Sequence, residues 1–210
     1  MSGDVHVRFC ERLEGWVLGA TRLVIGFTRE AEARRVMEVL PQRFGKYGLT
    51  IHPDKTRLVS FQCPPHASLP TGSPPCERPG TFDLLGFTHF WSRSRTGTWV
   101  VKRKTSASQF TRAVRKISHW CRQHRHDPIE EQYRTLCQKL RGHNAYYGIT
   151  GNSPSLWRFR EEVKRLWRKW LYRRKRGRGP GWSWFNRLLE RSPLPKSVTY
   201  HSVYHREAKE

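Results

Sequence analysis

The pattern of apolar and polar positions changes character once along the chain. Between residues 16 and 101, short apolar runs surround one longer amphipathic segment, which is typical of strands packed with a helix. The runs at residues 16–18 and 23–27 predict a hairpin that turns at residues 19–22. Four more strands are expected, at residues 49–51, 56–61, 82–90 and 98–102, the last two joined by a hairpin turn through residues 95–97. The first half of the chain is therefore expected to form an antiparallel sheet with one helix.

That helix is expected after residue 29. Its apolar side chains recur every three or four positions, at Ala33, Val36, Met37, Leu40, Phe44 and Tyr47. Glu30 and Glu32 near its start and Gly48 at its end are favourable at these helix termini. Pro41 is expected to kink the helix or to end it early. Residues 63–80 contain six prolines and predict a surface loop.

After Lys104 the apolar period becomes 3.6 and predicts three amphipathic helices. The first has apolar positions at Phe110, Ala113, Val114, Ile117 and Cys121, and its other positions include Arg112, Arg115, Lys116 and Arg122. The second starts at Asp127-Pro128 and directs Ile129, Tyr133, Leu136, Leu140 and Tyr147 inward. The third follows a break at residues 148–152, starts at Ser153-Pro154, and buries Leu156, Phe159, Val163, Leu166 and Trp170. The chain is thus expected to be α+β, with domains at residues 1–104 and 105–192 and a C-terminal tail at 193–210.

The charge of the chain indicates a polyanionic partner. Forty Lys and Arg residues face seventeen Asp and Glu residues, for a net charge of +23. Residues 102–191 hold 24 of the cations and only 6 of the acids, so the basic surface belongs to the helical half. Structured RNA is the expected partner, with DNA as a second candidate. Neutralising Arg165, Arg168 and Lys169 together is expected to reduce the salt dependence of RNA binding.

The candidate RNA-binding residues are cations and polar aromatics of this half. They are Lys102, Arg103, Lys104, Arg112, Arg115, Lys116, Arg141, His143, Tyr146, Arg165, Arg168, Lys169, Arg173, Arg174, Lys175 and Arg176. The nearby rings of Trp167, Tyr172, Trp182 and Trp184 are candidates for stacking on unpaired bases. For Trp167 the core and the RNA surface remain equal alternatives, whereas Trp170 is expected in the core.

Cysteine usage and hydropathy indicate an intracellular, cytoplasmic protein with no membrane partner. The five cysteines show no close pairing, no apolar run approaches the roughly 20 residues that span a bilayer, and the start of the chain does not resemble a signal peptide. Two groups of possible zinc ligands are Cys63, His66 and Cys76, and His119, Cys121, His124 and His126. The first lacks an obvious fourth ligand, and the second lies on a helix, where residues two apart face different directions. No metal site is predicted.

Three segments in fixed order carry a resemblance to a known family. They read GLTIHPDKT at residues 48–56, FDLLGF at 82–87 and LRGHNAYYG at 140–148, and a helix rich in arginine and tryptophan follows. Together they resemble the late palm and the thumb of a group II intron reverse transcriptase/maturase. The resemblance implies a partial polymerase palm at residues 1–104, a helical thumb or maturase domain after it, and an origin in bacteria or organelles. It implies that Arg141, His143 and Tyr146 lie in the segment that grips intron RNA.

Intact members of this family copy RNA into DNA with magnesium and assist RNA splicing, but the catalytic carboxylates have no counterpart here. Where the family has a Tyr-Ala-Asp-Asp turn, residues 19–22 read Gly-Ala-Thr-Arg, so Thr21 and Arg22 take the place of the metal-binding pair. Two-metal catalysis needs converging carboxylates, and the four aspartates of this chain are isolated in the sequence. No catalytic residue is predicted, although Lys55 matches a lysine at the edge of the family's active site. The chain alone is expected to lack polymerase activity and to need no cofactor.

The expected function is therefore RNA binding by a truncated, catalytically degenerate relative, with group II intron RNA as the partner and an open oligomeric state. Alternatives are a general basic RNA-binding module and a non-functional gene remnant. A separate chain that supplies the fingers and the rest of the palm is a further possibility, as is a frameshift or misplaced gene start upstream of the altered turn.

Overall fold

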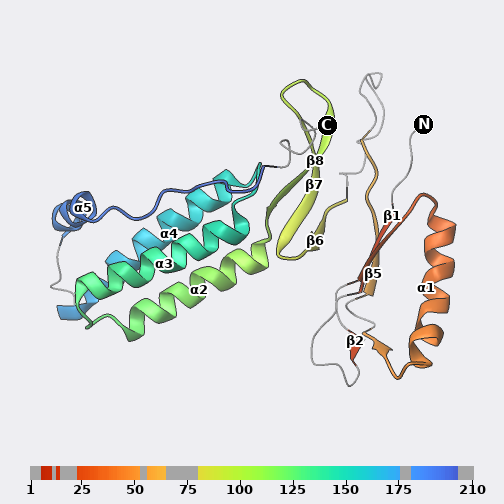
Figure 1. Ribbon diagram of the computed structural model, residues 1–210, viewed down its shortest axis with the longest axis horizontal. Helices are drawn as coiled ribbons and strands as arrows, with labels where there is room; N and C mark the ends of the chain where they lie inside the picture. Colours follow the sequence, from red (N-terminus) through yellow and green to blue (C-terminus); the bar gives the residue numbers. More distant parts are fainter. Residues whose placement is uncertain are drawn as a thin grey trace, which may run out of the picture. The chain divides into compact units, whose positions relative to one another are not determined.

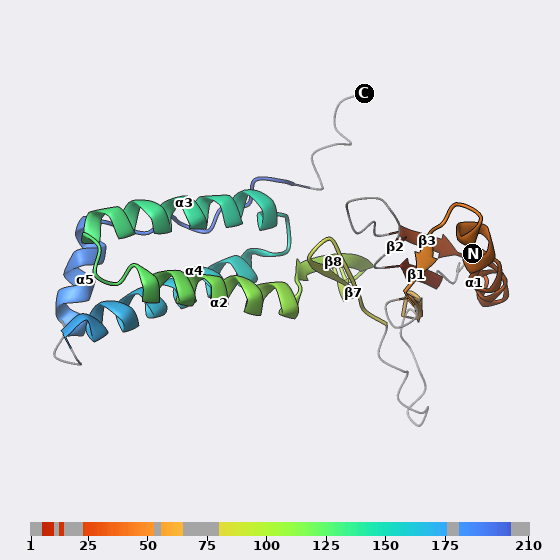
Figure 2. The same cartoon turned by 90° about the horizontal axis from the view of Figure 1, so that it is seen from below.

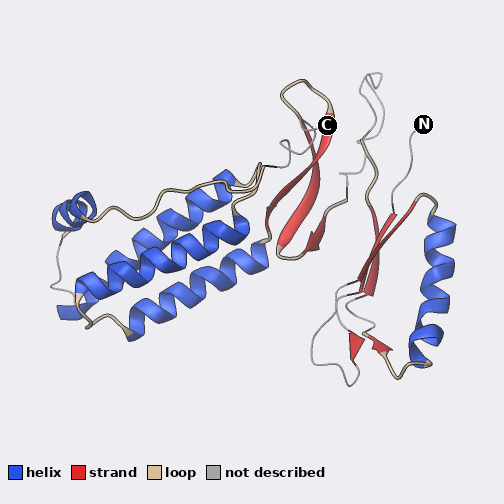
Figure 3. Cartoon of the chain, in the orientation of Figure 1, coloured by secondary structure: helices blue, strands red, loops and turns tan. Residues whose placement is uncertain are grey.

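The computed structural model describes residues 6–10, 13–14, 23–52, 56–64, 80–175 and 181–202, and the chain is α+β, as predicted (Figures 1 and 3). It divides into two compact units. Unit 1 comprises residues 1–82 and 89–102, and unit 2 comprises residues 83–88 and 103–210. The expected turn at residues 19–22, the strand at 16–18 and most of the proline-rich loop lie outside the described residues.

The sheet of unit 1 has a central strand that the sequence pattern did not predict. Its order is β3-β1-β5, in which β1 (His6–Cys10) pairs antiparallel with both β3 (Leu23–Phe27) and β5 (Thr56–Ser60). His6 lies opposite Phe27 on one side and Ser60 on the other. The described neighbour of β3 is β1, and the pairing of β3 with the expected strand at residues 16–18 falls on residues outside the described ranges. A separate two-stranded pair joins β2 (Leu13–Glu14) to β4 (Thr50–Ile51).

The helix of unit 1 is α1 (Glu30–Gly45), which lies beside this sheet in Figure 1. Pro41 was expected to kink this helix or to end it early; the second alternative is wrong, because α1 continues for four residues beyond Pro41. Ala33 is fully buried, whereas Tyr47, expected to face inward, follows the helix and is 81% exposed. The helical period does not constrain a side chain that lies beyond the last helical turn.

The predicted strand at residues 82–90 is in fact two strands, β6 (Phe82–Leu84) and β7 (Phe87–Arg93). Leu85 and Gly86 separate them with φ angles of 49° and 83°. Two consecutive positive φ angles are those of a type I′ turn, the preferred two-residue connection of a hairpin. The strand β8 (Trp99–Thr105) completes the order β6-β7-β8, and the predicted turn before it is confirmed by the bond from Ser94 N to Thr98 O, 2.7 Å long.

Unit 2 contains the three predicted helices and one that was not predicted. The helices α2 (Ala107–Gln123), α3 (Ile129–Tyr147) and α4 (Ser153–Tyr172) lie alongside one another in both views (Figures 1 and 2). A single 3-10 turn, η2 (Arg173–Lys175), follows α4, and α5 (Trp182–Arg191) lies at one end of the three helices. The residues that form their common core are Ile117, Cys121, Leu136, Cys137, Leu140, Phe159, Val163, Trp167, Leu171, Phe185 and Leu194.

The buried stripe of α4 differs in phase from the prediction. Leu156, Phe159 and Val163 are buried as expected, but the next fully enclosed positions are Trp167 and Leu171. The predicted Leu166 and Trp170 are only partly buried against the core. The unpredicted α5 explains the shift, because its Phe185 packs edge-on against Trp167, with ring centroids 5.6 Å apart.

The segment after α5, expected to be a tail, runs back along the helices up to residue 202 (Figure 1). Leu194 is 3% exposed and belongs to the core. Arg160 Nε donates to Pro195 O at 3.0 Å, and Asn144 Nδ2 donates to Lys196 O at 3.0 Å. His201 forms a parallel bridge with Ile149. These bonds attach residues 194–201 to α3, to α4 and to the connection between them.

Candidate nucleic-acid interface

The outer face of α2 carries cations without acids. Arg112, Arg115, Lys116 and Arg122 are exposed; Arg115 and Lys116 lie three and four residues after Arg112, and Arg122 lies seven, about two turns, after Arg115, so they share the side opposite the buried Ile117 and Cys121. The helix contains no Asp or Glu. Within the described residues, none of these four cations forms an ion pair. We call these four residues the α2 stripe; Arg122 was seen as a helix-face residue in the sequence but was not among the predicted contacts.

Cations on α3 and α4 are more often neutralised. Arg134 pairs with Glu130, Lys164 with Glu161 at 3.6 Å, and Arg165 with Glu162 at 2.9 Å. Exposed ion pairs such as Arg134–Glu130 contribute little to stability, about 0 to 1 kcal/mol each, but all three pairs reduce the local positive potential. The sequence alone did not predict these pairs, because they depend on side-chain geometry.

Three other predicted contacts on α4 and η2 lie near tryptophan rings. The guanidinium carbon of Arg168 is 3.6 Å from the ring centroid of Trp182. Lys169 Nζ and the guanidinium carbon of Arg173 lie 5.8 and 5.2 Å from the ring centroid of Trp170. Cation–π attraction positions these side chains while Lys169 and Arg173 remain exposed.

Arg174 is turned inward. Its guanidinium donates hydrogen bonds to the carbonyl oxygens of Arg125 and Asp127, which lie in the connection between α2 and α3. Burial lowers the pKa of Arg174, and the nearby Asp127 opposes that shift. The structure thus uses this predicted RNA contact to hold a loop. Lys175 lies in η2, and Arg176 lies outside the described residues.

The predicted cations of β8 differ among themselves. Lys102 Nζ donates to Arg93 O at 2.8 Å across the hairpin. Arg103 is half-buried, and Lys104 is exposed. All three consecutive residues were predicted as RNA contacts. Because side chains alternate between the two faces of a strand, they differ in exposure.

Two of the three family-like segments meet in unit 2. The Leu85-Gly86 turn lies against the end of α3, where Tyr146 Oη donates to Leu85 O at 2.9 Å. Phe87 stacks on Tyr146 with centroids 5.9 Å apart and meets Tyr147 edge-on at 5.3 Å. Tyr146 stays 54% exposed, whereas Tyr147 is half-buried, as the helical period predicted. Burial raises the pKa of the Tyr147 phenol, and the neighbouring Tyr146 adds a smaller rise. The positive charge of Arg112 is close enough to oppose this rise.

Asn152 connects Tyr147 to the segments that precede α2 and α4. Its side chain is fully buried; Oδ1 accepts from Thr105 N at 2.8 Å, while Nδ2 donates to Thr105 Oγ1 at 2.9 Å and to Tyr147 O at 2.8 Å. Thr105 lies two residues before α2, and Asn152 directly precedes α4. The third segment, residues 48–56, belongs to unit 1, and its Lys55 lies outside the described residues.

His143 is placed inside the helical unit, although it was a predicted RNA contact. Its ring stacks on Phe159 with centroids 3.8 Å apart and lies 4.6 Å from the Tyr147 ring. Burial lowers the pKa of His143 to about 4, so the ring is neutral at physiological pH and carries no charge for a phosphate. By contrast, the neighbouring candidate Arg141 is exposed on α3.

Two further exposed cations, Arg187 and Arg191, belong to α5 and were missed with that helix. The signal was present in the sequence: Phe185, Leu188 and Leu189 are spaced as one face of a helix and pack on the core.

The predicted place of the metal-binding pair, Thr21 and Arg22, lies outside the described residues. In the described part of the chain, no three His, Cys, Asp or Glu side chains gather as metal ligands would. Cys121, from one of the groups weighed for zinc, is a core residue whose thiol pKa is raised by burial to about 12.

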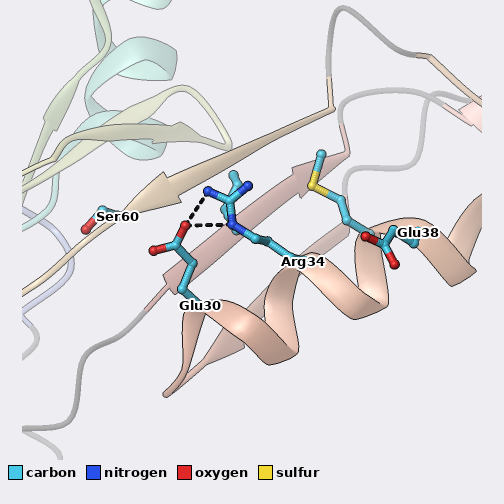
Figure 4. Close-up of a pocket in the computed structure, with 6 residues that line it drawn as sticks. Glu30, Arg34, Glu38 and Ser60 are labelled. Atoms are coloured by element: carbon cyan, nitrogen blue, oxygen red, sulfur yellow. Dashed lines mark hydrogen bonds and ion pairs between the residues drawn. The ribbon is translucent and has the colours of Figure 1, made fainter.

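A hollow of about 540 Å³ lies between α1 and β5 of unit 1 (Figure 4). Its lining includes Glu30, Arg34, Glu38 and Ser60, and the guanidinium of Arg34 pairs with Glu30. Arg34 is the one cation among the described residues that line this hollow, and its pairing with Glu30 leaves little attraction for a phosphate; the described lining includes none of the predicted contacts.

Comparison with protein-family models, with curated proteins and with solved structures found no match. Each helix in the described ranges is too short or too polar to cross a membrane.

Proposed function

We propose that unit 2 binds structured RNA, with the α2 stripe as its main phosphate-binding surface. One observation carries this proposal: four exposed cations share one face of a helix that contains no acidic residue. Such a face repels itself unless a polyanion approaches, and RNA provides phosphates at regular spacing. The paired cations of α3 and α4 would contribute less, because their carboxylates already neutralise them.

We further propose that the chain is a relative of group II intron reverse transcriptase/maturases, and that it stabilises folded intron RNA. The α+β class, the three long helices and the contact of residues 85–87 with Tyr146 and Tyr147 support this assignment. The proposed activity is binding without a chemical step, because Thr21 and Arg22 stand in the sequence where the resemblance requires two aspartates. We assign no metal to this activity, although intact members of the family use magnesium.

The test compares two variants that each remove three charges. The stripe variant carries Arg115→Gln, Lys116→Gln and Arg122→Gln; Arg112 is retained because it lies near Tyr147. Each lost phosphate contact lowers the slope of log affinity against log salt by about 0.7 to 0.9, so a reduction of about two to three is expected. Affinity would be measured by filter binding of the whole chain to a folded group II intron RNA between 50 and 300 mM salt.

The matched control carries Arg134→Gln, Lys164→Gln and Arg165→Gln, which removes three paired cations. Its slope is expected to fall by less than about one, because these groups release few counterions on binding. Equal slopes for the two variants would contradict an interface centred on α2. An unrelated structured RNA of equal length, measured in parallel, separates the alternatives: preference for the intron RNA supports the maturase assignment, and equal affinity supports a general RNA-binding module.

A further inference from the structure

We propose that Trp182 is a stacking site for an unpaired RNA base, with Arg168 as the support of its ring. This inference rests on the proposed function, but it concerns a different surface and a different kind of contact. It assigns unpaired nucleotides of a loop, bulge or strand end to the junction of α4 and α5, and backbone phosphates to the α2 stripe.

The structure distinguishes Trp182 from the other aromatic candidates. Trp167 is fully buried and donates from Nε1 to Gln132 Oε1 at 3.0 Å, so its ring is inaccessible. Trp184 and Trp170 are partly buried and pack on the core. Trp182 is 51% exposed, although it belongs to α5, which packs on the core through the fully buried Phe185. Docking of α5 therefore does not explain an exposed tryptophan at its first position.

One face of the indole has no stacked group among the described residues. The guanidinium of Arg168 covers the other face at 3.6 Å from the centroid, a distance typical of stacked planar groups. The only other ring contact of Trp182 in the described part of the chain is a T-shaped one with Phe185, with centroids 6.4 Å apart. A base on the free face would extend the stack to guanidinium, indole and base.

Arg168 has two effects on such a stack. It holds the indole in one orientation before RNA binds, which reduces the entropy lost on binding. It also places a positive charge two stacking distances from the bound base, on the far side of the indole, where it attracts the negatively charged nucleotide. Tyr172, on the next turn of α4, is 42% exposed and adds a second ring at this end of the helices. Interleaved aromatic and cationic side chains are the usual composition of sites for single-stranded nucleic acid.

The experiment uses two RNAs with the same stem. One closes with an adenine-rich loop that contains 2-aminopurine, and the other is a blunt duplex of equal length with no unpaired base. Trp182→Ala is expected to weaken binding of the loop RNA on the order of ten-fold, the usual effect of removing one stacked aromatic, and to leave duplex affinity and salt slope unchanged. Stacking should also quench 2-aminopurine fluorescence with the wild-type chain and not with the variant.

Two further variants keep the test decisive. Trp182→Phe preserves an aromatic face and should retain most of the affinity for the loop RNA, which separates stacking from loosening of α5. Trp157→Ala removes a tryptophan that is 58% exposed on α4 and makes no ring or cation contact among the described residues, and it should change neither RNA.

The stacking site is refuted if Trp182→Ala leaves loop binding unchanged, or if it weakens loop and duplex RNA equally. Salt-dependent binding of both RNAs by the wild-type chain would in that case leave the α2 stripe standing. If the wild-type chain binds neither RNA, the proposed function itself fails.

Discussion

Replacing Asn152 with alanine is expected to destabilise the helical unit more than any other single loss of a polar side chain named above. The amide is fully buried and makes three hydrogen bonds, two to Thr105 and one to Tyr147 O. The change removes all three bonds; Thr105 N loses this acceptor, whereas Tyr147 O still accepts from Ile149 N at 2.8 Å. The amide joins Asn152, directly before α4, to Thr105, two residues before α2. Its loss therefore removes the hydrogen bonds that hold the starts of these two helices together.

The expected magnitude follows from the number of bonds. Each hydrogen bond contributes about 1 kcal/mol net, and each buried group left unpaired costs about 1 to 3 kcal/mol. Since these two figures partly describe the same loss, we expect the free energy of unfolding to fall by about 3 to 5 kcal/mol. A loss of that size is a large fraction of the stability of a domain, typically about 5 to 15 kcal/mol.

The assay is urea unfolding of the whole chain at pH 7, followed by circular dichroism at 222 nm, which reports mainly the helices. Asn144→Ala is the matched control: Asn144 is 4% exposed but makes a single recorded side-chain bond, to Lys196 O. Its loss should cost only about 1 to 2 kcal/mol. Both variants replace a buried asparagine with alanine, so the difference between their losses in unfolding free energy reports the number of hydrogen bonds removed.

Asn152→Asp provides a second readout. It keeps an acceptor for Thr105 N but places a carboxylate against Tyr147 O in a site without solvent, so the variant should be unstable at pH 7. Burial raises the folded-state pKa of such an acid, so the folded state binds the proton more tightly. The stability of the variant relative to wild type should therefore recover as the pH falls. The reasoning is refuted if Asn152→Ala costs less than about 1 kcal/mol, or no more than Asn144→Ala.

Two further predictions concern the turn and the buried imidazole. Leu85→Gly should stabilise the chain by about 0.5 to 1 kcal/mol, because φ 49° is strained for leucine, whereas Gly86→Ala should destabilise it, since its φ is 83° and a Cβ would lie 3.0 Å from Tyr147 Oη. Urea titrations of both variants check this, and a loss of stability in Leu85→Gly would show that the turn is not strained. For His143, whose folded pKa of about 4 is below the ordinary value of 6.5, the neutral form favours folding; stability should be complete above about pH 6.5 and fall by up to about 3 kcal/mol toward pH 4. His143→Phe should flatten that part of the stability curve, and an unchanged curve would mean that the imidazole is hydrated in solution.

The sequence by itself determined the elements whose signal is local. The spacing of apolar residues predicted α2, α3 and α4, and the inward faces of the first two, because helical period depends on neighbours only three or four residues away. The concentration of cations in the helical half is likewise a property of the sequence. The stripe of α4 was predicted only in its first half, since the same helix offers two adjacent apolar rows and α5 decides which is enclosed.

The tertiary structure decided what depends on distant partners. The pairing of β1 with β3 and β5, and the contact of the Leu85-Gly86 turn with Tyr146, join residues far apart in sequence, and no local pattern specifies such partners. The same holds for the cations, which were equivalent as letters. Folding directs Arg174 to the carbonyl oxygens of a loop and Arg168 to the Trp182 ring, and it leaves the α2 stripe exposed on a helix without acidic residues, because the position of each side chain on its helix determines which groups it can reach.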